Sequence, residues 1–226
     1  MSDLATLPPF KTRAGEALAD GWLKTAIDRT TGTARTKRAA IVGQWPDFQV
    51  ARQRGKAIKD HVVANLGHYL AEFERNAIAS GAHVHYASTA DEAADLVVRL
   101  CKEAGARSVT RSKSMLGEEI GLPHALAEAG IERVETDLAE HIVQLAGERP
   151  SHIIWPALHK TREQISELFK AAHDDPHGEE TPEAMAASAR RFLRVKFLEA
   201  DIGISGANFL VADSGSVCTV CLLYTS

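Results

Sequence analysis

The part of the chain after residue 80 alternates short apolar runs with helix-forming segments, and this alternation restricts the fold more than any other feature. Four of the runs read as strands: residues 83–87, 107–111, 131–135 and 152–156. Strands that alternate with helices of this length predict a parallel sheet with helices on both faces. We therefore expect an α/β fold with an open, mainly parallel sheet.

Several of the expected helices begin at recognisable capping residues. Thr89–Glu92 and Thr161–Gln164 each match the capping box, in which two side chains cap each other's backbone N–H groups. Asp137 is expected to cap another helix, and Thr181–Pro182 predicts the start of the last one. These caps place a helix directly after three of the four expected strands.

The first 80 residues read as helical throughout. Trp45–Asp47 is expected to interrupt the helices, because the residue before a proline disfavours helical backbone. After that break, apolar side chains recur at steps of three and four, which predicts one face of a single long helix: Ile58, Val62, Leu66, Tyr69, Leu70 and Phe73. We expect a helical region (residues 1–80), an α/β domain (81–217) and a tail foreign to the protein (218–226).

The composition is that of a globular protein and argues against several classes of function. The chain has 226 residues, 45% of them hydrophobic, and its net charge of −4 gives no global electrostatic reason to bind nucleic acid. No run approaches the roughly 18 apolar residues of a membrane span, and the N-terminus has no apolar signal-peptide core. Only three cysteines are present, which favours the reducing cytoplasm over a disulfide framework.

Three loops are expected at the edge of the sheet where ligands bind. They span residues 111–115, 157–161 and 203–208. In open α/β sheets, ligands bind at the carboxyl ends of the strands. Because each loop follows an expected strand, we predict that the three loops meet in one cleft.

The first loop combines hydroxyl groups, a cation and acids. Ser112, Lys113 and Ser114 are candidates for contacting an anion, although the glycine pattern of a phosphate-binding P-loop is absent. The alternative is that Ser114 only caps a helix. Glu118 lies in the first turn of that helix, where the helix dipole favours acids, and the alternative is a role as general base.

The second loop contains a histidine that is a candidate for proton transfer. His159 precedes Lys160 and Thr161, and an imidazole changes its charge near neutral pH. The chain has ten histidines, but none shows the spacing of a zinc site. No metal site is therefore expected.

The third loop brings glycine and small polar residues to the end of an expected strand. Ser205, Gly206 and Asn208 are candidate ligand contacts, because glycine lets a ligand approach the backbone closely. Asp213 follows and is a candidate catalytic carboxylate. The alternative is a tight hairpin between two strands.

Three long stretches carry a resemblance to a known family: "SKSMLGEEIGL" (residues 112–122), "VETDLAEHIVQLAGERPSHIIWPALHKTREQI" (134–165) and "FLEADIGISGANFLVADSGS" (197–216). They resemble the LUD domain of the lactate-utilisation proteins, and most of all the iron–sulfur subunit of that family. The resemblance implies a fold like that of the sugar-phosphate isomerases and CoA transferases. It also implies a cytoplasmic role in oxidising lactate to pyruvate beside other lactate-utilisation subunits. The candidate loops would then bind a small carboxylate or phosphate.

The chain departs from the family pattern after Val217. Family members carry a ferredoxin-like segment with cysteines for 4Fe–4S clusters, and none of its C-x2-C-x2-C-x3-C-P runs occurs here. We therefore expect a fragment that holds no cofactor and is inactive alone. Asp213 stands where the family usually has glutamate. Cys218 and Cys221 look like a redox or metal pair, but two thiols supply half of such a site, and we interpret them as part of the foreign tail.

Two other functions stay open from the sequence. The same fold hosts CoA transfer and sugar-phosphate isomerisation, for which Glu118 or Asp213 would act as base or nucleophile. The other is a non-catalytic scaffold that only docks partner subunits. Binding of CoA or a sugar phosphate would favour the first, and an unbroken apolar patch on the helical half would favour the second.

Overall fold

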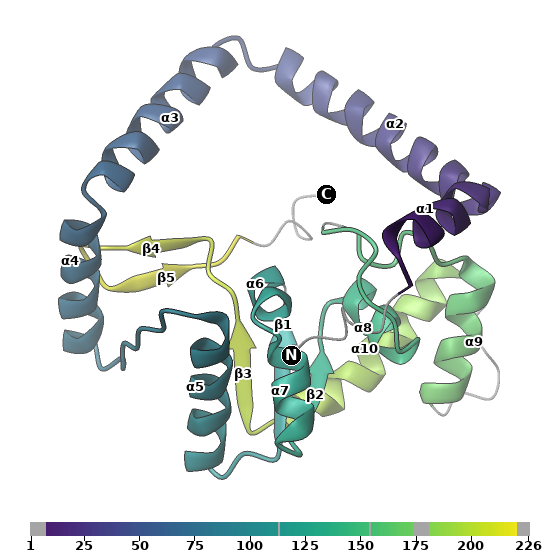
Figure 1. Ribbon diagram of the computed structural model, residues 1–226. Helices are drawn as coiled ribbons and strands as arrows, with labels where there is room; N and C mark the ends of the chain where they lie inside the picture. The colour runs from purple at the N-terminus through teal and green to yellow at the C-terminus, as the bar shows by residue number, and fades with distance from the viewer. Residues whose placement is uncertain (1–7, 113, 154, 174–180, 221–226) are drawn as a thin grey trace. The chain divides into compact units, whose positions relative to one another are not determined.

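The chain divides into two compact units. The first consists of residues 1–26 and 87–206, and the second of residues 27–86 and 207–226. The first unit holds a parallel sheet with its helices, and the second holds helices and a hairpin (Figure 1). The computed structural model describes residues 8–112, 114–153, 155–173 and 181–220.

The sheet of the first unit has three parallel strands in the order β2-β1-β3 (Figure 1). β1 (Ser108–Ser112) lies in the middle, between β2 (Glu132–Glu135) and β3 (Ile202–Ser205). Helices join the strands along the chain, as parallel pairing requires. This arrangement confirms the prediction of an α/β fold with an open parallel sheet and an N-terminal helical region.

Seven helices lie wholly within the described part of the first unit. Gly121, with a left-handed φ of +70°, separates two short helices between β1 and β2. The helices are α1 (Phe10–Ala19), α5 (Ala90–Glu103), α6 (Met115–Glu119), α7 (Leu122–Glu128), α8 (Leu138–Leu145), α9 (Arg162–Ala172) and α10 (Pro182–Glu199).

The expected helix caps form as the sequence indicates. Thr89 accepts a hydrogen bond from the backbone N–H of Glu92 at 3.2 Å, and Asp137 accepts one from Ala139 at 3.1 Å. At the start of α9, the side chain of Thr161 and that of its box partner cap each other's N–H groups, so the full capping box is present. Local sequence therefore determined these helix starts.

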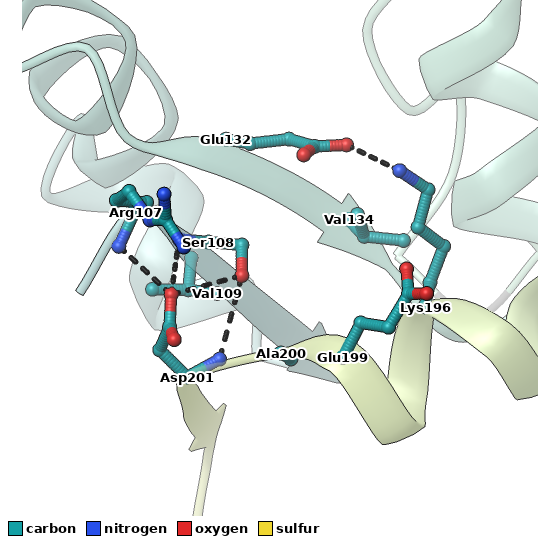
Figure 2. A pocket seen from close by; sticks show the side chains of 9 residues that line it. All are labelled: Arg107, Ser108, Val109, Glu132, Val134, Lys196, Glu199, Ala200 and Asp201. Atoms are coloured by element: carbon teal, nitrogen blue, oxygen red, sulfur yellow. Dashed lines mark hydrogen bonds and ion pairs between the residues drawn. The ribbon is translucent and has the colours of Figure 1, made fainter.

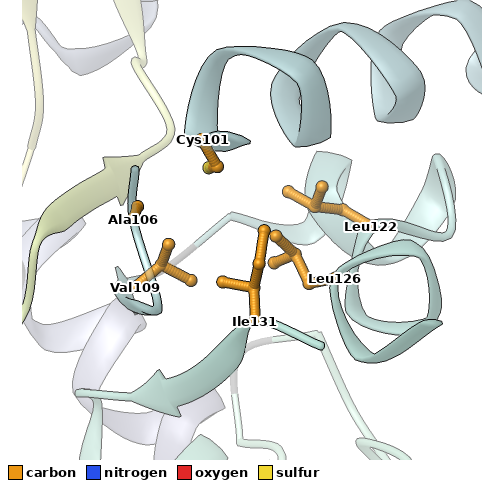
Figure 3. Packing of buried hydrophobic residues seen from close by; sticks show 6 residues of the cluster. All are labelled: Cys101, Ala106, Val109, Leu122, Leu126 and Ile131. Atoms are coloured by element: carbon orange, nitrogen blue, oxygen red, sulfur yellow. The ribbon is translucent and has the colours of Figure 1, made fainter. Parts of the chain in front are cut away.

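One apolar core packs against β1. Val109 on β1 and Leu126 on α7 are each 0% exposed, and Figure 3 shows them converging with residues of α5 and of the turns beside the strands. Cys101 belongs to this core, and burial raises the pKa of its thiol. Cys101 is 2% exposed, and a protonated thiol is a poor nucleophile.

The prediction of two of the four strands is wrong. Residues 83–87 are irregular, and residues 152–156 form bends and a turn in their described part. The backbone carbonyl of Pro156 accepts hydrogen bonds from the N–H of Ser151 at 3.0 Å and from its hydroxyl at 2.9 Å. The segment thus closes on itself, since an apolar run without a neighbouring strand cannot satisfy its backbone in a sheet.

The helices of the second unit are shorter than the apolar periodicity predicts. α2 (Gly21–Gly43) runs from the first unit into the second, and α3 (Phe48–Ala64) follows the expected break at Trp45–Asp47. α4 (Leu66–Ala79) is separate because Asn65 has non-helical backbone and donates its amide to the carbonyl of His61 at 2.8 Å. The single long helix is therefore two helices.

A hairpin of β4 (Phe209–Val211) and β5 (Ser216–Cys218) packs its turn against α4. The Asn76 amide donates to the carbonyls of Ala212 at 2.8 Å and Asp213 at 3.1 Å. Gly215 has φ +68°, and a Cβ there would lie 2.2 Å from the backbone nitrogen of Ala77. Only glycine fits this contact.

Within the described ranges, no helix is long and apolar enough to cross a membrane.

A chain of two histidines and a serine joins α8, α9 and α10. The Nε2 atoms of His141 and His173 lie 3.0 Å apart, and His173 Nδ1 lies 3.0 Å from the hydroxyl of Ser188. The rings of Phe169 and Phe192 pack against both imidazoles. Burial, and then the neighbouring His173, lower the pKa of His141 to about 4.

The His141 pair makes stability depend on pH. Unfolded histidine gains its proton below about pH 6.5, whereas His141 stays neutral in the folded protein down to about 4. The contribution of His141 to stability is therefore full above pH 6.5 and falls as the pH drops towards 4, by about 3 kcal/mol. The difference in the free energy of unfolding in urea between the wild type and His141→Gln, followed from pH 7 to 4, measures this loss, because the other titrating groups are present in both proteins. The exposed His124→Gln is the control, and an equal loss in both variants would contradict the assignment.

Candidate functional site

A buried arginine at the end of the middle strand organises the carboxyl edge of the sheet. The side chain of Arg111 is 3% exposed, and its Nε and Nη2 atoms both lie 2.8 Å from Glu135 Oε1. Its Nη2 atom also pairs with Glu118 of α6. Buried charges require partners, and here two carboxylates from different elements surround one guanidinium.

Sheet register brings the central pair together. Arg111 on β1 lies directly beside Glu135 on β2. Glu135, whose side chain is 4% exposed, also accepts from Nη1 of Arg133 at 2.7 Å. Glu118 is different, because it is 30% exposed and comes from a helix of five residues. The site thus has one fixed carboxylate and one that reaches the surface.

Among the described residues of this edge, two buried polar atoms have no hydrogen-bond partner: Arg111 Nη1 and Glu140 Oε2. Nη1 lies against Gly117, where a Cβ would come within 2.7 Å of it. Glycine at that position therefore leaves room for the guanidinium. Unpartnered buried polar atoms are rare in proteins and often mark functional sites.

Glu140 holds its proton more tightly than an ordinary glutamate. Burial raises its pKa from 4.5 to about 7, helped by the charge and hydrogen bond of Asp137 and by the charge of Glu135, while Arg111 opposes the rise. Glu140 can therefore hold a proton near neutral pH. A carboxyl group with such a pKa is suited to taking up or releasing a proton.

Four of the predicted ligand residues lie together at this edge. Ser112 on β1 pairs in register with Ser205 on β3. Ser114 caps α6 by accepting from the N–H of Gly117 at 3.3 Å, and a Cβ on Gly206 would lie 3.1 Å from its hydroxyl oxygen. The first and third loops thus meet at these residues. Lys113 lies outside the described residues.

The second loop makes contacts of its own. His159 lies 2.6 Å from a carboxylate oxygen of Glu148 through Nε2 and 2.9 Å from the hydroxyl of Ser151 through Nδ1. Lys160 pairs with the same Glu148, and Thr161 caps α9. These bonds hold the loop in place. In the described residues, no strand runs directly into this loop. The reason for expecting the loop at the carboxyl edge of the sheet therefore no longer holds.

Asn208 and Asp213 belong to the second unit and hold its hairpin. The N–H of Asn208 donates to the carbonyl of Cys218 at 2.9 Å, and its side-chain oxygen accepts from Val220 at 2.8 Å. The carbonyl of Asp213 accepts from Asn76, and its residue is exposed. These contacts favour the hairpin interpretation over a ligand role.

A cavity of about 340 Å³ lies at the opposite, amino-terminal edge of the sheet. Figure 2 shows Asp201 accepting from the N–H groups of Arg107 at 2.8 Å and Ser108 at 3.0 Å, bonds that lower the pKa of its carboxyl. Lys196 and Glu132 pair at 2.7 Å on the other side. Because these groups hold strand starts together, we assign the cavity a structural role.

A separate hollow of about 500 Å³ is lined by Arg190, Arg191 and Arg194.

The described residues do not fit an iron–sulfur cluster. Such clusters are held by four thiolates, and the chain has three cysteines. Cys101 is buried in the first unit, whereas Cys218 is exposed in the second. Cys221 lies outside the described residues. In the part that the structure describes, no three histidine, cysteine or acidic side chains gather to hold a metal.

The sequence places Arg111 in the first candidate loop, but its motifs do not single out Arg111, Glu135 or Glu140 as site residues. Arg111, Glu135 and Glu140 lie in a strand end, a second strand end and a helix, and none forms a known motif. The available signal was a charged residue at the same end of two neighbouring apolar strands. This signal can be recognised only when it is known that β1 and β2 are adjacent and in register.

The fold and this edge define the class of protein: a mixed α/β protein whose open parallel sheet carries a buried ion cluster at the carboxyl ends of its strands. The sequence model of the LUD domain matches residues 70–221. The chain therefore belongs to the LUD-domain family, as its sequence motifs predicted.

Curated relatives match almost the whole chain. The uncharacterized electron transport protein YkgF of Escherichia coli K12 is 40% identical over 216 residues, which are 93% of this chain and 44% of that protein. Lactate utilization protein B of Bacillus thuringiensis is 39% identical over 219 residues, with the same coverage of 93% and 44%. The chain thus spans less than half the length of these relatives. No solved structure matches it.

Replacing Glu140 tests whether its carboxyl group has a raised pKa in the folded protein. Folded Glu140 keeps its proton up to about pH 7, whereas unfolded glutamate loses it near 4.5. Its burial therefore reduces stability as the pH rises from 4.5 to 7. The neutral Glu140→Gln variant should be more stable than the wild type at pH 8, by roughly 1–2 kcal/mol, and no more stable at pH 4. The free energy of unfolding in urea, measured at both pH values, tests this expectation. Glu119→Gln, at an exposed position, is the control.

Proposed function

We propose that the chain is the N-terminal part of the iron–sulfur subunit of a complex that oxidises lactate to pyruvate and passes the electrons onward. The observation that carries the proposal is its 39% identity to lactate utilization protein B over 93% of its length. The electron transport protein of Escherichia coli, at 40% identity, supports the electron-transfer role. Both matches run through the LUD domain.

The proposal places the 4Fe–4S clusters outside the described residues, since these do not supply the thiolates for one. Its partners would be the other lactate-utilisation subunits, and its place of action the cytoplasm. The LUD domain would then contribute a binding surface for a small acid. The divisions at residues 80 and 217 that the sequence suggests are part of the same proposal.

The ligand site of this proposal is the carboxyl edge of β1 and β3. Ser112, Ser114, Ser205 and Gly206 support it because they meet there. Lys113 belongs to the same loop and would add a cation. The proposed set also includes His159, Lys160, Thr161 and Asn208, for which no described contact to this edge adds support.

Growth on lactate tests the proposed function. Deleting the gene that encodes the chain should abolish growth of its host on lactate as the carbon source, because the proposed reaction forms pyruvate from lactate. Growth on pyruvate should continue, since pyruvate is formed after the proposed reaction. Returning the gene should restore growth on lactate. Undiminished growth of the deletion strain on both lactate enantiomers would contradict the proposal.

A further inference from the structure

We propose that Arg111 binds the carboxylate of a small 2-hydroxy or 2-oxo acid, and that Glu118 is an internal carboxylate which occupies this guanidinium until the ligand displaces it. The identity of the acid rests on the proposed function. The residues and their roles rest on the geometry of the carboxyl edge.

The two carboxylates on Arg111 differ in how firmly they are held. Glu135 lies on a strand, is 4% exposed, and accepts from both Arg111 and Arg133. Among the described residues, Glu118 pairs with Arg111; it is 30% exposed and lies on the five-residue helix α6. Removing Glu135 would take a shared partner from both Arg111 and Arg133, whereas Glu118 can turn towards solvent. Glu118 is therefore the exchangeable group.

The guanidinium can bind more than it does in this structure. Nη1 of Arg111 is buried, makes no hydrogen bond within the part of the chain that the structure describes, and faces Gly117 of α6. A carboxylate that replaces Glu118 could accept from Nη2 and Nη1 together, in the two-pronged geometry that arginine favours. Glu118 itself engages Nη2 and leaves Nη1 unpaired. An external carboxylate can thus form one hydrogen bond more with Arg111 than Glu118 does.

Charge balance favours an exchange of one carboxylate for another. Among the described side chains that pair directly with one another here, Arg111 and Arg133 carry two positive charges, and Glu118 and Glu135 carry two negative charges. A monocarboxylate that replaces Glu118 keeps this set of four neutral, whereas a phosphate dianion would add negative charge to it. This selects a small monocarboxylate.

The surroundings of α6 suit a ligand with a second polar group. Ser112 and Ser114 are half-buried and lie on either side of residue 113, next to the first turn of α6. Gly206 keeps β3 close to Ser114 without a side chain between them. A hydroxyl or keto oxygen beside the carboxylate can thus find hydroxyl partners at the same edge.

Internal competition lowers the apparent affinity, because only molecules with Glu118 displaced are ready to bind. Neutralising Glu118 removes the competitor. In Glu118→Gln the dissociation constant for pyruvate, measured by calorimetric titration of the purified chain, should therefore fall about tenfold, within the range expected for one hydrogen bond to a charged group. Arg111→Lys should lose pyruvate binding, since lysine cannot form the two-pronged contact.

Glu119→Gln is the matched control, since it removes the same charge one residue along from an exposed position. Its affinity should equal that of the wild type. Equal dissociation constants for the Glu118 and Glu119 variants would overturn the proposal, as would unchanged binding by Arg111→Lys. Circular dichroism and urea unfolding establish that each variant folds.

A measurement on the wild type needs no variant to fold. Nitrogen NMR of the arginine side chains should show a shift of the Arg111 Nε–H signal as pyruvate is added, and none with a neutral analogue such as acetone. An unmoved Arg111 signal at saturating pyruvate would overturn the proposal.

The two proposals can fail separately. Loss of growth on lactate in the deletion strain, together with equal pyruvate binding by the Glu118 and Glu119 variants, would reject the role of Arg111 and keep the lactate function. Tighter binding of pyruvate by Glu118→Gln, with normal growth of the deletion strain on lactate, would keep the carboxylate site and reject the pathway.

Discussion

The ion pair between Arg111 and Glu135 is the interaction on which the carboxyl edge of the sheet depends. Removing two charges from water is costly, and the structure offsets that cost by giving the Glu135 carboxylate donors from two arginines. The pair also fixes how β1 and β2 align. A slip by one residue in either direction would set Arg111 beside Val134 or Thr136, neither of which carries a charge.

That pair places the other groups of the edge. Glu118 approaches the same guanidinium from α6, so the short helix is held over the end of β1. Its N-cap, Ser114, is brought close to Gly206 at the end of β3. On the other side, the negative charge of Glu135 helps to keep a proton on Glu140. One buried ion pair therefore helps to position a surface carboxylate, while burial and Asp137 have the larger effects on the protonation of Glu140.

Local rules recovered much of the fold. The caps at Thr89, Asp137 and Thr161 and the strands near residues 108 and 132 depend on nearby residues, so the sequence was sufficient for them. The run at 152–156 had the composition of a strand, but strand formation also requires a neighbour, and the chain closes a turn there instead. Pairing partners are a property of the tertiary structure, which composition does not contain.

The same limit applies to the candidate site. Hydroxyl groups and a lysine next to a strand end are visible in the sequence, and Ser112, Ser114 and Gly206 do come together. Arg111 reads as an ordinary surface charge until β2 places Glu135 beside it. His159 was selected for its chemistry, yet its two ring nitrogens contact Glu148 and Ser151. Chemical type alone did not reveal which polar residues are buried.

A double-mutant cycle tests the central claim most directly. The free energy of unfolding in urea would be measured for Arg111→Met, Glu135→Gln and the double variant. Each single change should cost about 3–5 kcal/mol, because it leaves an uncompensated buried group, and the double variant should cost at least about 2 kcal/mol less than the sum. Single costs below about 1 kcal/mol that simply add would contradict the account.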